Sequence, residues 1–188
     1  MSAPRDARLV NLLGALATGL TDRIQDAAHA VAQLEGTAPA ALIVLLDFSP
    51  SGSVQKLSEI CGLTHSGSVR LVDRLAAAGY VERGPGRTAR SVTVTLTPAG
   101  RAVALDLRTA RQSAIAGTIE ALSARQRAEL AQACDTVITA LTEQRLAQRA
   151  AGAAPAGGAL CRMCDFSACG RDVGDCPAAR TASPNTGG

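Results

Sequence analysis

The sequence predicts a mainly α-helical fold that is interrupted by one small β-hairpin. Of its 188 residues, 47% are hydrophobic but only 2% are aromatic, so the core must consist mainly of Leu, Val, Ile and Ala. Leu and Ala are strong helix formers. Apolar residues recur every three or four positions over most of the chain, as in amphipathic helices, and alternate with polar residues only around residues 80–96.

The first predicted helix extends from about Arg5 to Leu34 and ends before Gly36. Its apolar stripe consists of Leu9, Leu13, Leu16, Leu20, Ile24, Ala27, Val31 and Leu34. Thr37 is expected to cap a second helix over Pro39–Phe48, because proline is tolerated in the first turn of a helix. A Ser-Pro-Ser-Gly loop is expected over residues 49–52.

Two shorter helices follow, joined by a four-residue turn. Ser53 is expected to cap a helix over Val54–Cys61, which a glycine ends. Thr64 is the next capping residue and begins a helix over His65–Ala78, which another glycine ends. Two helices joined in this way predict a helix-turn-helix unit.

After this unit the period of the sequence changes from helical to alternating. Residues 80–83 and 91–96 are expected to form two strands, and the Gly/Pro/Arg-rich segment 84–90 is expected to form the turn between them. A β-hairpin that directly follows a helix-turn-helix predicts a winged helix over about residues 37–97. The tip of its wing is basic and exposed.

Two long helices complete the predicted fold. Thr97 and Pro98 begin one that runs to about Ala121, and a capping box at Ser123 begins another that reaches Arg149. The last helix carries the apolar stripe Leu130, Cys134, Val137 and Leu141. The first helix is about 42 Å long, more than one small lobe can cover. We therefore expect the helices at about 5–35 and 98–149 to form the interface of a homodimer.

The winged helix carries a candidate DNA-binding surface. Residues at the N-terminal end of a recognition helix reach base edges in the major groove, and here these residues are small or able to hydrogen-bond. Between positions 64 and 90 the sequence contains five arginines and only two acidic residues, a positive balance that suits contact with phosphates and the minor groove. We expect Asp73 to pair with Arg70 and Arg74. The candidate DNA contacts are Thr64, His65, Ser66, Ser68, Arg70, Arg74, Arg83, Arg87 and Arg90. In the alternative interpretation, the lobe contacts only proteins and its arginines are solvated.

The segment LTHSGSVRLVDRLAAAGYVERG and the following SVTVTLTPAGR resemble the MarR family of bacterial transcription regulators. The resemblance covers roughly Val10–Arg149. It implies a homodimer with two winged lobes, joined through the first and last helices, that binds a palindromic operator in double-stranded DNA. The wing of that family usually carries Asp-x-Arg at its tip. Here Thr88, Ala89 and Arg90 stand at those positions, so the arginine is kept and the aspartate is missing.

Four of the six cysteines, Cys161, Cys164, Cys169 and Cys176, lie within sixteen residues. The spacing C-x2-C-x4-C-x6-C brings four thiolates within reach of one centre, which suits either a tetrahedral Zn²⁺ ion or an iron–sulfur cluster. The wide second spacing and the Cys-Pro ending favour the cluster, whereas zinc is the commoner ligand of small four-cysteine modules. A third possibility is free thiols that form disulfides on oxidation. The stretch resembles the cluster-binding tail of SoxR-type regulators, which belong to a separate family and space their cysteines differently.

Residues 1–150 are therefore expected to form a MarR-like domain and 151–160 an Ala/Gly/Pro linker. Residues 161–177 hold the four-cysteine motif, and 178–188 are expected to be a disordered tail. Cys61 and Cys134 are expected to be small core residues.

The function that these patterns favour is a DNA-binding transcriptional regulator. We expect a repressor whose operator affinity responds to redox state, metal or a small ligand. No arrangement of residues indicates an enzyme, and no apolar run is long enough to span a membrane, so we expect a cytoplasmic protein. The alternative is a metal-binding or electron-transfer protein in which the winged helix is an interaction module.

Overall fold

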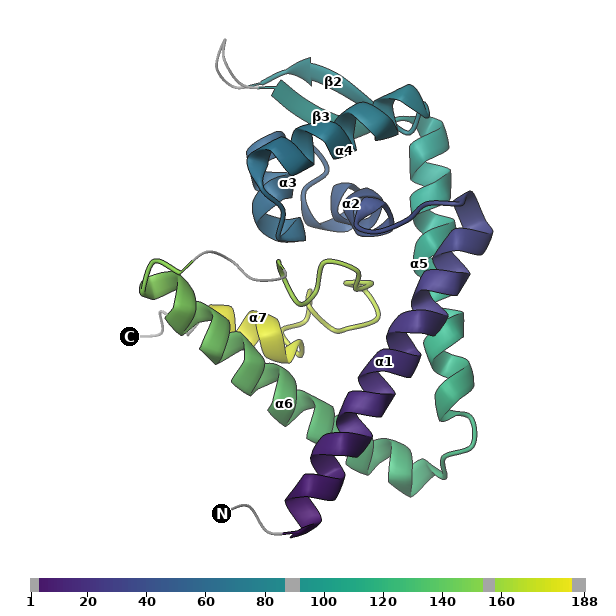
Figure 1. Cartoon of the computed structure of the whole chain (residues 1–188), viewed down its shortest axis with the longest axis vertical. Helices are drawn as coiled ribbons and strands as arrows, with labels where there is room; N and C mark the ends of the chain where they lie inside the picture. The colour runs from purple at the N-terminus through teal and green to yellow at the C-terminus, as the bar shows by residue number, and fades with distance from the viewer. Residues whose placement is uncertain (1–3, 87–91, 154–157, 184–188) are drawn as a thin grey trace.

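The computed structural model describes residues 4–86, 92–153 and 158–183, with the backbone alone for residues 4–6 (Figure 1). The predicted fold class is confirmed: the chain is mainly helical and carries a small antiparallel sheet. The helical elements are α1 (Pro4–Ala32), α2 (Ala38–Ile43), the π-helical turn η1 (Val44–Phe48), α3 (Val54–Cys61), α4 (His65–Ala77), α5 (Pro98–Ile119), α6 (Ala124–Ala150) and α7 (Pro177–Ala182). The strands are β1 (Gly52–Ser53), β2 (Val81–Pro85) and β3 (Val92–Leu96).

Four of the predicted helix caps are confirmed. The side chains of Ser53, Thr64, Thr97 and Ser123 each accept a hydrogen bond from a backbone amide three residues later. The Thr37 cap is wrong, since its hydroxyl makes no capping bond and its backbone is itself helical, with φ −92° and ψ −3°. Gly36, with φ +60°, makes a left-handed turn directly before Thr37. Thr37 therefore enters α2 with a helical backbone, whereas the other four capping residues have an extended one.

The predicted second helix is divided into α2 and η1. The amide of Ser49 donates to the carbonyl of Val44 at 2.8 Å, a five-residue span that widens the last turn into a π-helix. The chain then forms β1 where a loop was expected. Gly52 pairs with Val94, which gives a three-stranded sheet in the order β1-β3-β2.

The core lies inside the winged lobe. All six residues of α2 are buried, and α3, α4, the sheet and the first part of α5 surround this helix. The largest fully buried side chains in the described residues are Leu42, Ile43, Leu45, Leu57, Leu71, Leu75 and Leu107. As the composition predicted, aliphatic residues build this core.

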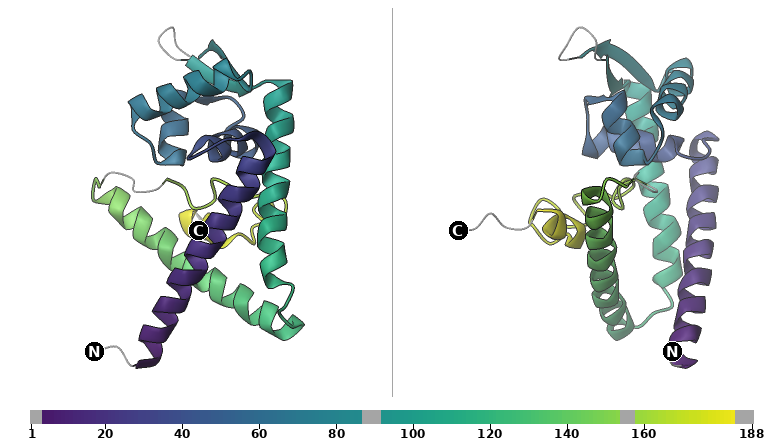
Figure 2. Two further views of the ribbon diagram at one scale, coloured as in Figure 1. Left: turned by 45° about the vertical axis from the view of Figure 1, so that its right-hand side comes forward. Right: turned by 60° about the vertical axis from the view of Figure 1, so that its left-hand side comes forward.

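Outside the lobe, α1 packs along α5, and α6 runs back from the far end of α5 toward the lobe (Figures 1 and 2). Among its 27 residues, only Thr142 is buried. The short helix α7 packs against α6. None of the helices described is both long and apolar enough to cross a lipid bilayer.

The presence of α7 corrects the expectation of a disordered tail from residue 178. Pro177 occupies the first helical position, where its missing amide proton is not needed, and alanines with high helix propensity follow it. The hydroxyl of Thr181 donates to the carbonyl of Pro177 at 2.8 Å. Residues 184–188 lie outside the described residues.

Candidate DNA-binding surface and cysteine module

The first turns of α4 present a polar, exposed face at the outer end of the winged lobe, beside the β2–β3 hairpin (Figure 1). The predicted contact residues Thr64, His65, Ser66, Arg70 and Arg74 are all exposed there. The Thr64 hydroxyl accepts a hydrogen bond from the amide of Gly67 at 3.1 Å and lies 3.3 Å from the Ser66 hydroxyl. This face can therefore offer hydroxyl, imidazole and guanidinium groups to the edges and phosphates of a duplex.

Ser68 is not part of this face. Its side chain is fully buried, and its Oγ is the one buried side-chain oxygen or nitrogen without a hydrogen-bond partner in the described part of the chain. Its prediction as a DNA contact is therefore wrong. Ser68 lies four residues after the cap Thr64, on the side of α4 that also carries Leu71, Val72 and Leu75 against the core.

Arg83 lies on β2 and forms an ion pair with Asp73 of α4, with Nη2 and Oδ1 2.6 Å apart. The expected pairing of Asp73 with its helix neighbours Arg70 and Arg74 is thus replaced by a contact between two elements. This ion pair ties the wing to the recognition helix. Arg87 and Arg90 lie outside the described residues, so their role in DNA contact stays a prediction.

Residues 158–176, which we call the cysteine module, form a series of turns between the winged lobe and α6 (Figures 1 and 2). The four predicted cysteines are free thiols; Cys176 is buried and the other three are partly buried. Three left-handed glycines, Gly158, Gly170 and Gly174, shape the turns. At Gly170 (φ +68°), an added Cβ would come within 2.8 Å of the Cβ of Asp175, so this turn requires glycine.

The four thiols lie close enough to affect one another electrostatically. Burial raises the pKa of Cys161, Cys164 and Cys169, and neighbouring thiols of the group raise each of these pKa values further. Arginines act in the opposite sense: Arg171 and Arg145 favour the thiolate of Cys161, and Arg111 favours that of Cys164. Four free thiols with cationic neighbours form a donor set that suits a metal ion or a cluster held by thiolates.

The positions of the thiols do not amount to a formed coordination site. Within residues 4–86, 92–153 and 158–183, no group of three His, Cys, Asp or Glu side chains has the arrangement that would hold a metal ion. The donor set therefore fits a metal chemically, whereas a bound metal would have to draw the four sulfur atoms closer together.

The cysteine module is attached to the rest of the protein through groups that the sequence analysis missed. Phe48, at the end of η1, packs edge-on against Phe166 with the ring centroids 5.4 Å apart, and the Arg171 guanidinium lies over both rings. Arg108 of α5 lies 2.9 Å from a carboxylate oxygen of Asp47 and 3.7 Å from one of Asp165. Phe48 and Phe166 are the two phenylalanines of the chain, but one sequence alone does not show that they meet.

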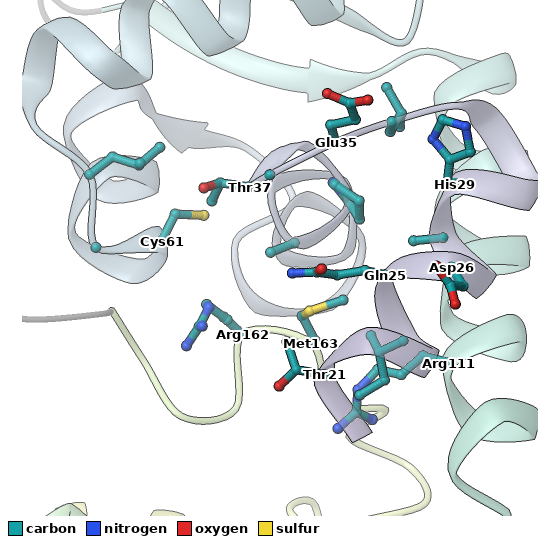
Figure 3. Close-up of a pocket in the computed structure, with 18 of the residues that line it drawn as sticks. Thr21, Gln25, Asp26, His29, Glu35, Thr37, Cys61, Arg111, Arg162 and Met163 are labelled. Atoms are coloured by element: carbon teal, nitrogen blue, oxygen red, sulfur yellow. The ribbon is translucent and has the colours of Figure 1, made fainter. Parts of the chain in front are cut away.

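A cavity of about 810 Å³ lies between α1, α2, the end of α3 and the cysteine module (Figure 3). Thr21, Gln25 and His29 of α1 line one side of it. Arg162 and Met163 line it from the cysteine module, and Met163 also packs against the hydrophobic core. The cysteine module is thus one wall of a large cavity beside the winged lobe.

The two remaining cysteines differ from each other. Cys61 is buried at the end of α3, as expected, and burial raises its pKa to about 11. Cys134 is exposed on α6, so its assignment to the core is wrong for the single chain. The stripe to which it belongs, with Leu130, Val137 and Leu141, is also exposed.

Solved structures of MarR-family proteins have the same fold. A MarR family protein from Bacillus stearothermophilus is 24% identical, with a TM-score of 0.66 over 76% of this chain and 99% of that one. A MarR family protein of Mycobacterium tuberculosis is 26% identical, with a TM-score of 0.57 over 70% of this chain and 95% of that one. The same protein in complex with DNA is 24% identical, with a TM-score of 0.57 over 72% of this chain and 98% of that one.

These neighbours are matched almost completely, whereas about a quarter of this chain lies outside each alignment. The winged lobe with its long helices is therefore a known arrangement. No protein-family model matches the sequence, and no curated protein does.

Proposed function

We propose that this chain is a DNA-binding transcriptional regulator, a repressor, that acts as a homodimer on a palindromic operator. The observation that carries the proposal is the exposed polar face of α4, which stands beside a wing in a helix-turn-helix lobe. The fold shared with MarR-family structures, one of them in complex with DNA, supports it. Arg70 and Arg74 give this face positive charge, where phosphates would lie, whereas the charge of Arg83 is offset by its ion pair with Asp73.

The apolar surface of the long helices supports a homodimer. The N-terminal half of α1 carries apolar side chains that are 48% to 68% exposed, namely Leu9, Val10, Leu12, Leu13 and Leu16, and the stripe on α6 is exposed as well. Exposed apolar side chains clustered along a helix often mark a protein–protein interface. A second copy of the chain, placed against both helices, would cover these side chains.

Arg70→Ala tests the DNA-binding surface. If Arg70 reads a base, the variant should bind its selected operator about 1–3 kcal/mol more weakly and a random duplex almost unchanged. Arg125→Ala is the matched control, since Arg125 is 88% exposed on α6 and pairs with Glu129, remote from the lobe. Equal losses on both duplexes would assign Arg70 to a phosphate. Unchanged binding to both would remove this face from the interface.

The wing is tested by salt dependence. Replacing Arg87 and Arg90 by Ala should lower the slope of log affinity against log salt by up to about 2, at roughly 0.9 per lost phosphate contact. An unchanged slope and affinity would place the wing away from the duplex.

We further propose that Cys161, Cys164, Cys169 and Cys176 bind an iron–sulfur cluster or Zn²⁺ and that this site sets the response of the regulator. An absorption spectrum of anaerobically purified protein, with metal analysis, separates the two: a cluster gives visible charge-transfer bands, whereas zinc leaves the protein colourless. Replacing Cys161 and Cys164 by Ser should abolish metal binding, and Cys134→Ser, on exposed α6, should not. Equal metal content in both variants would contradict the site.

The cavity beside α1 is a second candidate site at which a ligand could change the affinity of the protein for its operator. Its mixture of polar, cationic and apolar groups, and its position between the lobe and the long helices, suit a small organic ligand. A ligand that binds there should change operator affinity in the Cys161/Cys164 double variant as well as in the parent protein.

A further inference from the structure

The end of the linker lies directly on the helix-turn-helix. The carbonyl of Ile60 is one of the last carbonyls of α3, which have no partner within the helix. The amide of Ala159 donates to this carbonyl at 2.7 Å. A residue of the linker therefore satisfies the C-terminal end of α3, immediately before the turn that leads into α4.

The contact requires a glycine at the position before Ala159. Gly158 is buried and has a φ of +70°. An added Cβ would lie 2.4 Å from the carbonyl oxygen of Ile60 and 2.6 Å from backbone atoms of Cys61 and Gly62. Because all of these are backbone atoms of the turn, a larger residue would have to move the linker away from it. Arg145 of α6 holds the same glycine from the other side by donating to its carbonyl.

A second attachment follows the first pair of cysteines. The carboxylate of Asp165 accepts a hydrogen bond at 2.9 Å from Gln112 of α5, and hydrogen bonds from Ser167 lower the pKa of this carboxyl. The ring of Phe166 packs against Phe48 of η1. Residues 165–166 are thus fixed to α5 and to the lobe.

Cys161 and Cys164 lie between these two attachments. They occupy one turn, in which the amide of Cys164 donates to the carbonyl of Cys161 at 3.0 Å. A metal that draws their sulfur atoms toward Cys169 and Cys176 must move a short segment of chain that is held at both ends. The end at Gly158–Ala159 is held by the helix-turn-helix itself.

We propose that the backbone contact of Gly158 and Ala159 with the end of α3 transmits the state of the four cysteines to the recognition helix. The inference rests on the proposed function, of which it specifies the regulation. As the structure shows it, the contact holds the turn between α3 and α4 in one orientation. When a metal draws the cysteines together, the segment pulls on this contact and the turn gains freedom. The two states then differ in affinity for the operator, as any signal requires.

The test compares Gly158→Ala with Gly152→Ala in the full chain. Gly152 also has a positive φ, +72°, and lies near the start of the same linker, but an added Cβ there would meet no atom within 4 Å. Both variants carry the strain of a left-handed alanine, and only Gly158→Ala disturbs the contact. Each protein is measured anaerobically in its metal-loaded form and after chelation. The readouts are metal content, operator affinity and hydrogen exchange of the amides in residues 58–64.

The parent protein and Gly152→Ala should show the same difference between loaded and chelated forms. We expect exchange in the turn to be about twofold to tenfold faster in the loaded form, the range that one hydrogen bond gives, with a change in operator affinity of similar size. Gly158→Ala should bind metal and DNA, yet its exchange and its affinity should be equal in the two forms.

A parent-like response of Gly158→Ala overturns the inference and leaves the proposed function standing. A lost response in Gly152→Ala as well would overturn it too, because the linker would then act without the specific contact. If the parent itself binds neither metal nor DNA, the proposed function is wrong and this inference falls with it. Should Gly158→Ala fail to fold, Ala159→Pro decides: it removes the amide that donates to the Ile60 carbonyl, keeps the cysteines and their neighbouring arginines, and should weaken the response at unchanged metal content.

Discussion

At the scale of single residues, the position of a polar side chain on the helix decides whether it is exposed at the candidate DNA-binding surface or packed in the core. Thr64, Ser66 and Ser68 lie within five residues of sequence, but the first two are exposed and the third is fully buried. The sequence pattern alone grouped them together, because all three are small and able to hydrogen-bond. A serine in the core is small enough for close packing, but its hydroxyl lacks a partner here.

Ser68→Ala should therefore stabilise the protein by about 1–2 kcal/mol, because it removes a buried hydroxyl without a hydrogen bond and changes the volume little. Urea denaturation gives the free energy of unfolding. Operator affinity should stay the same, since the side chain does not reach the surface. Ser66→Ala is the matched control and should leave stability within about 0.5 kcal/mol. A destabilised Ser68→Ala protein would mean that the hydroxyl has a partner, such as an ordered water.

Cys61 and Cys134 should differ in their reaction with iodoacetamide, which requires the thiolate. Burial raises the pKa of Cys61 to about 11, so at pH 8 the folded single chain, such as the Leu13→Glu monomer expected below, should be labelled at Cys134 and spared at Cys61. Because the folded pKa lies above the unfolded value of 9.0, the contribution of this thiol to stability is complete below pH 9 and is lost between about pH 9 and 11. Mass spectrometry of labelled peptides checks the first expectation. Equal labelling of both cysteines at pH 8 would contradict the burial of Cys61.

At the scale of elements, the junction between the sheet and α5 is the tightest in the lobe. Thr97 donates from its backbone amide to the carbonyl of Tyr80 at 3.1 Å and from its hydroxyl to that of Gly79 at 2.6 Å. Gly100, in the first turn of α5, faces the same strand entry: an added Cβ would come within 1.8 Å of the Tyr80 carbonyl oxygen. The helix therefore lies so close to the entry of the wing that no side chain fits between the two backbones at this position.

Gly100→Ala should destabilise the protein by about 3 kcal/mol or more, since the wing or α5 must shift to admit one methyl group. Gly117→Ala in the same helix is the matched control. Its added Cβ would meet only the end of the Arg23 side chain, at 3.7 Å, so the higher helix propensity of alanine should stabilise it by about 0.5–1 kcal/mol. Thermal and urea unfolding measure both. Similar stabilities of the two variants would contradict the close junction.

The elements also show what one sequence can predict. Local chemistry predicted the helices and four caps, because Ser, Thr and Gly act on their own neighbours in the chain. The π-helical turn, the pairing of β1 with β3, and the contact of Phe48 with Phe166 all depend on residues far apart in sequence. Ser68 is buried because of the way α4 is rotated about its own axis relative to the core. A pattern of residue types predicts that rotation only approximately.

At the scale of the whole molecule, the single chain leaves apolar side chains of α1 and α6 exposed to solvent. A 27-residue helix with one buried residue gains little stability from its contacts with α7 and the cysteine module, because long helices depend on packing of an apolar face. Leucines of α1 are exposed as well. The arrangement in Figure 2 leaves both helices open to a partner.

Leu13→Glu should therefore shift the protein from dimer to monomer and lower operator affinity at least tenfold, because a charged group would enter the dimer interface and each duplex would bind one lobe at a time. Asn11→Glu is the control: it lies about 200° around α1 from Leu13, at 100° per residue, and should remain dimeric. Analytical ultracentrifugation measures the mass. A dimeric Leu13→Glu protein would place the interface elsewhere.

The contact between Ala159 and Ile60 also sets an order in time as the protein is made. A ribosome adds about 5–20 residues per second, so roughly 5–20 seconds pass between synthesis of the two partners. In the second half of that interval, once Leu107 has been made, the winged lobe has every residue of its core through Leu107, while the last carbonyls of α3 still face water. The nascent protein thus has a helix-turn-helix before it has the segment that we propose controls it. A chain released late in that interval would carry the candidate DNA-binding face of α4 without the four clustered cysteines.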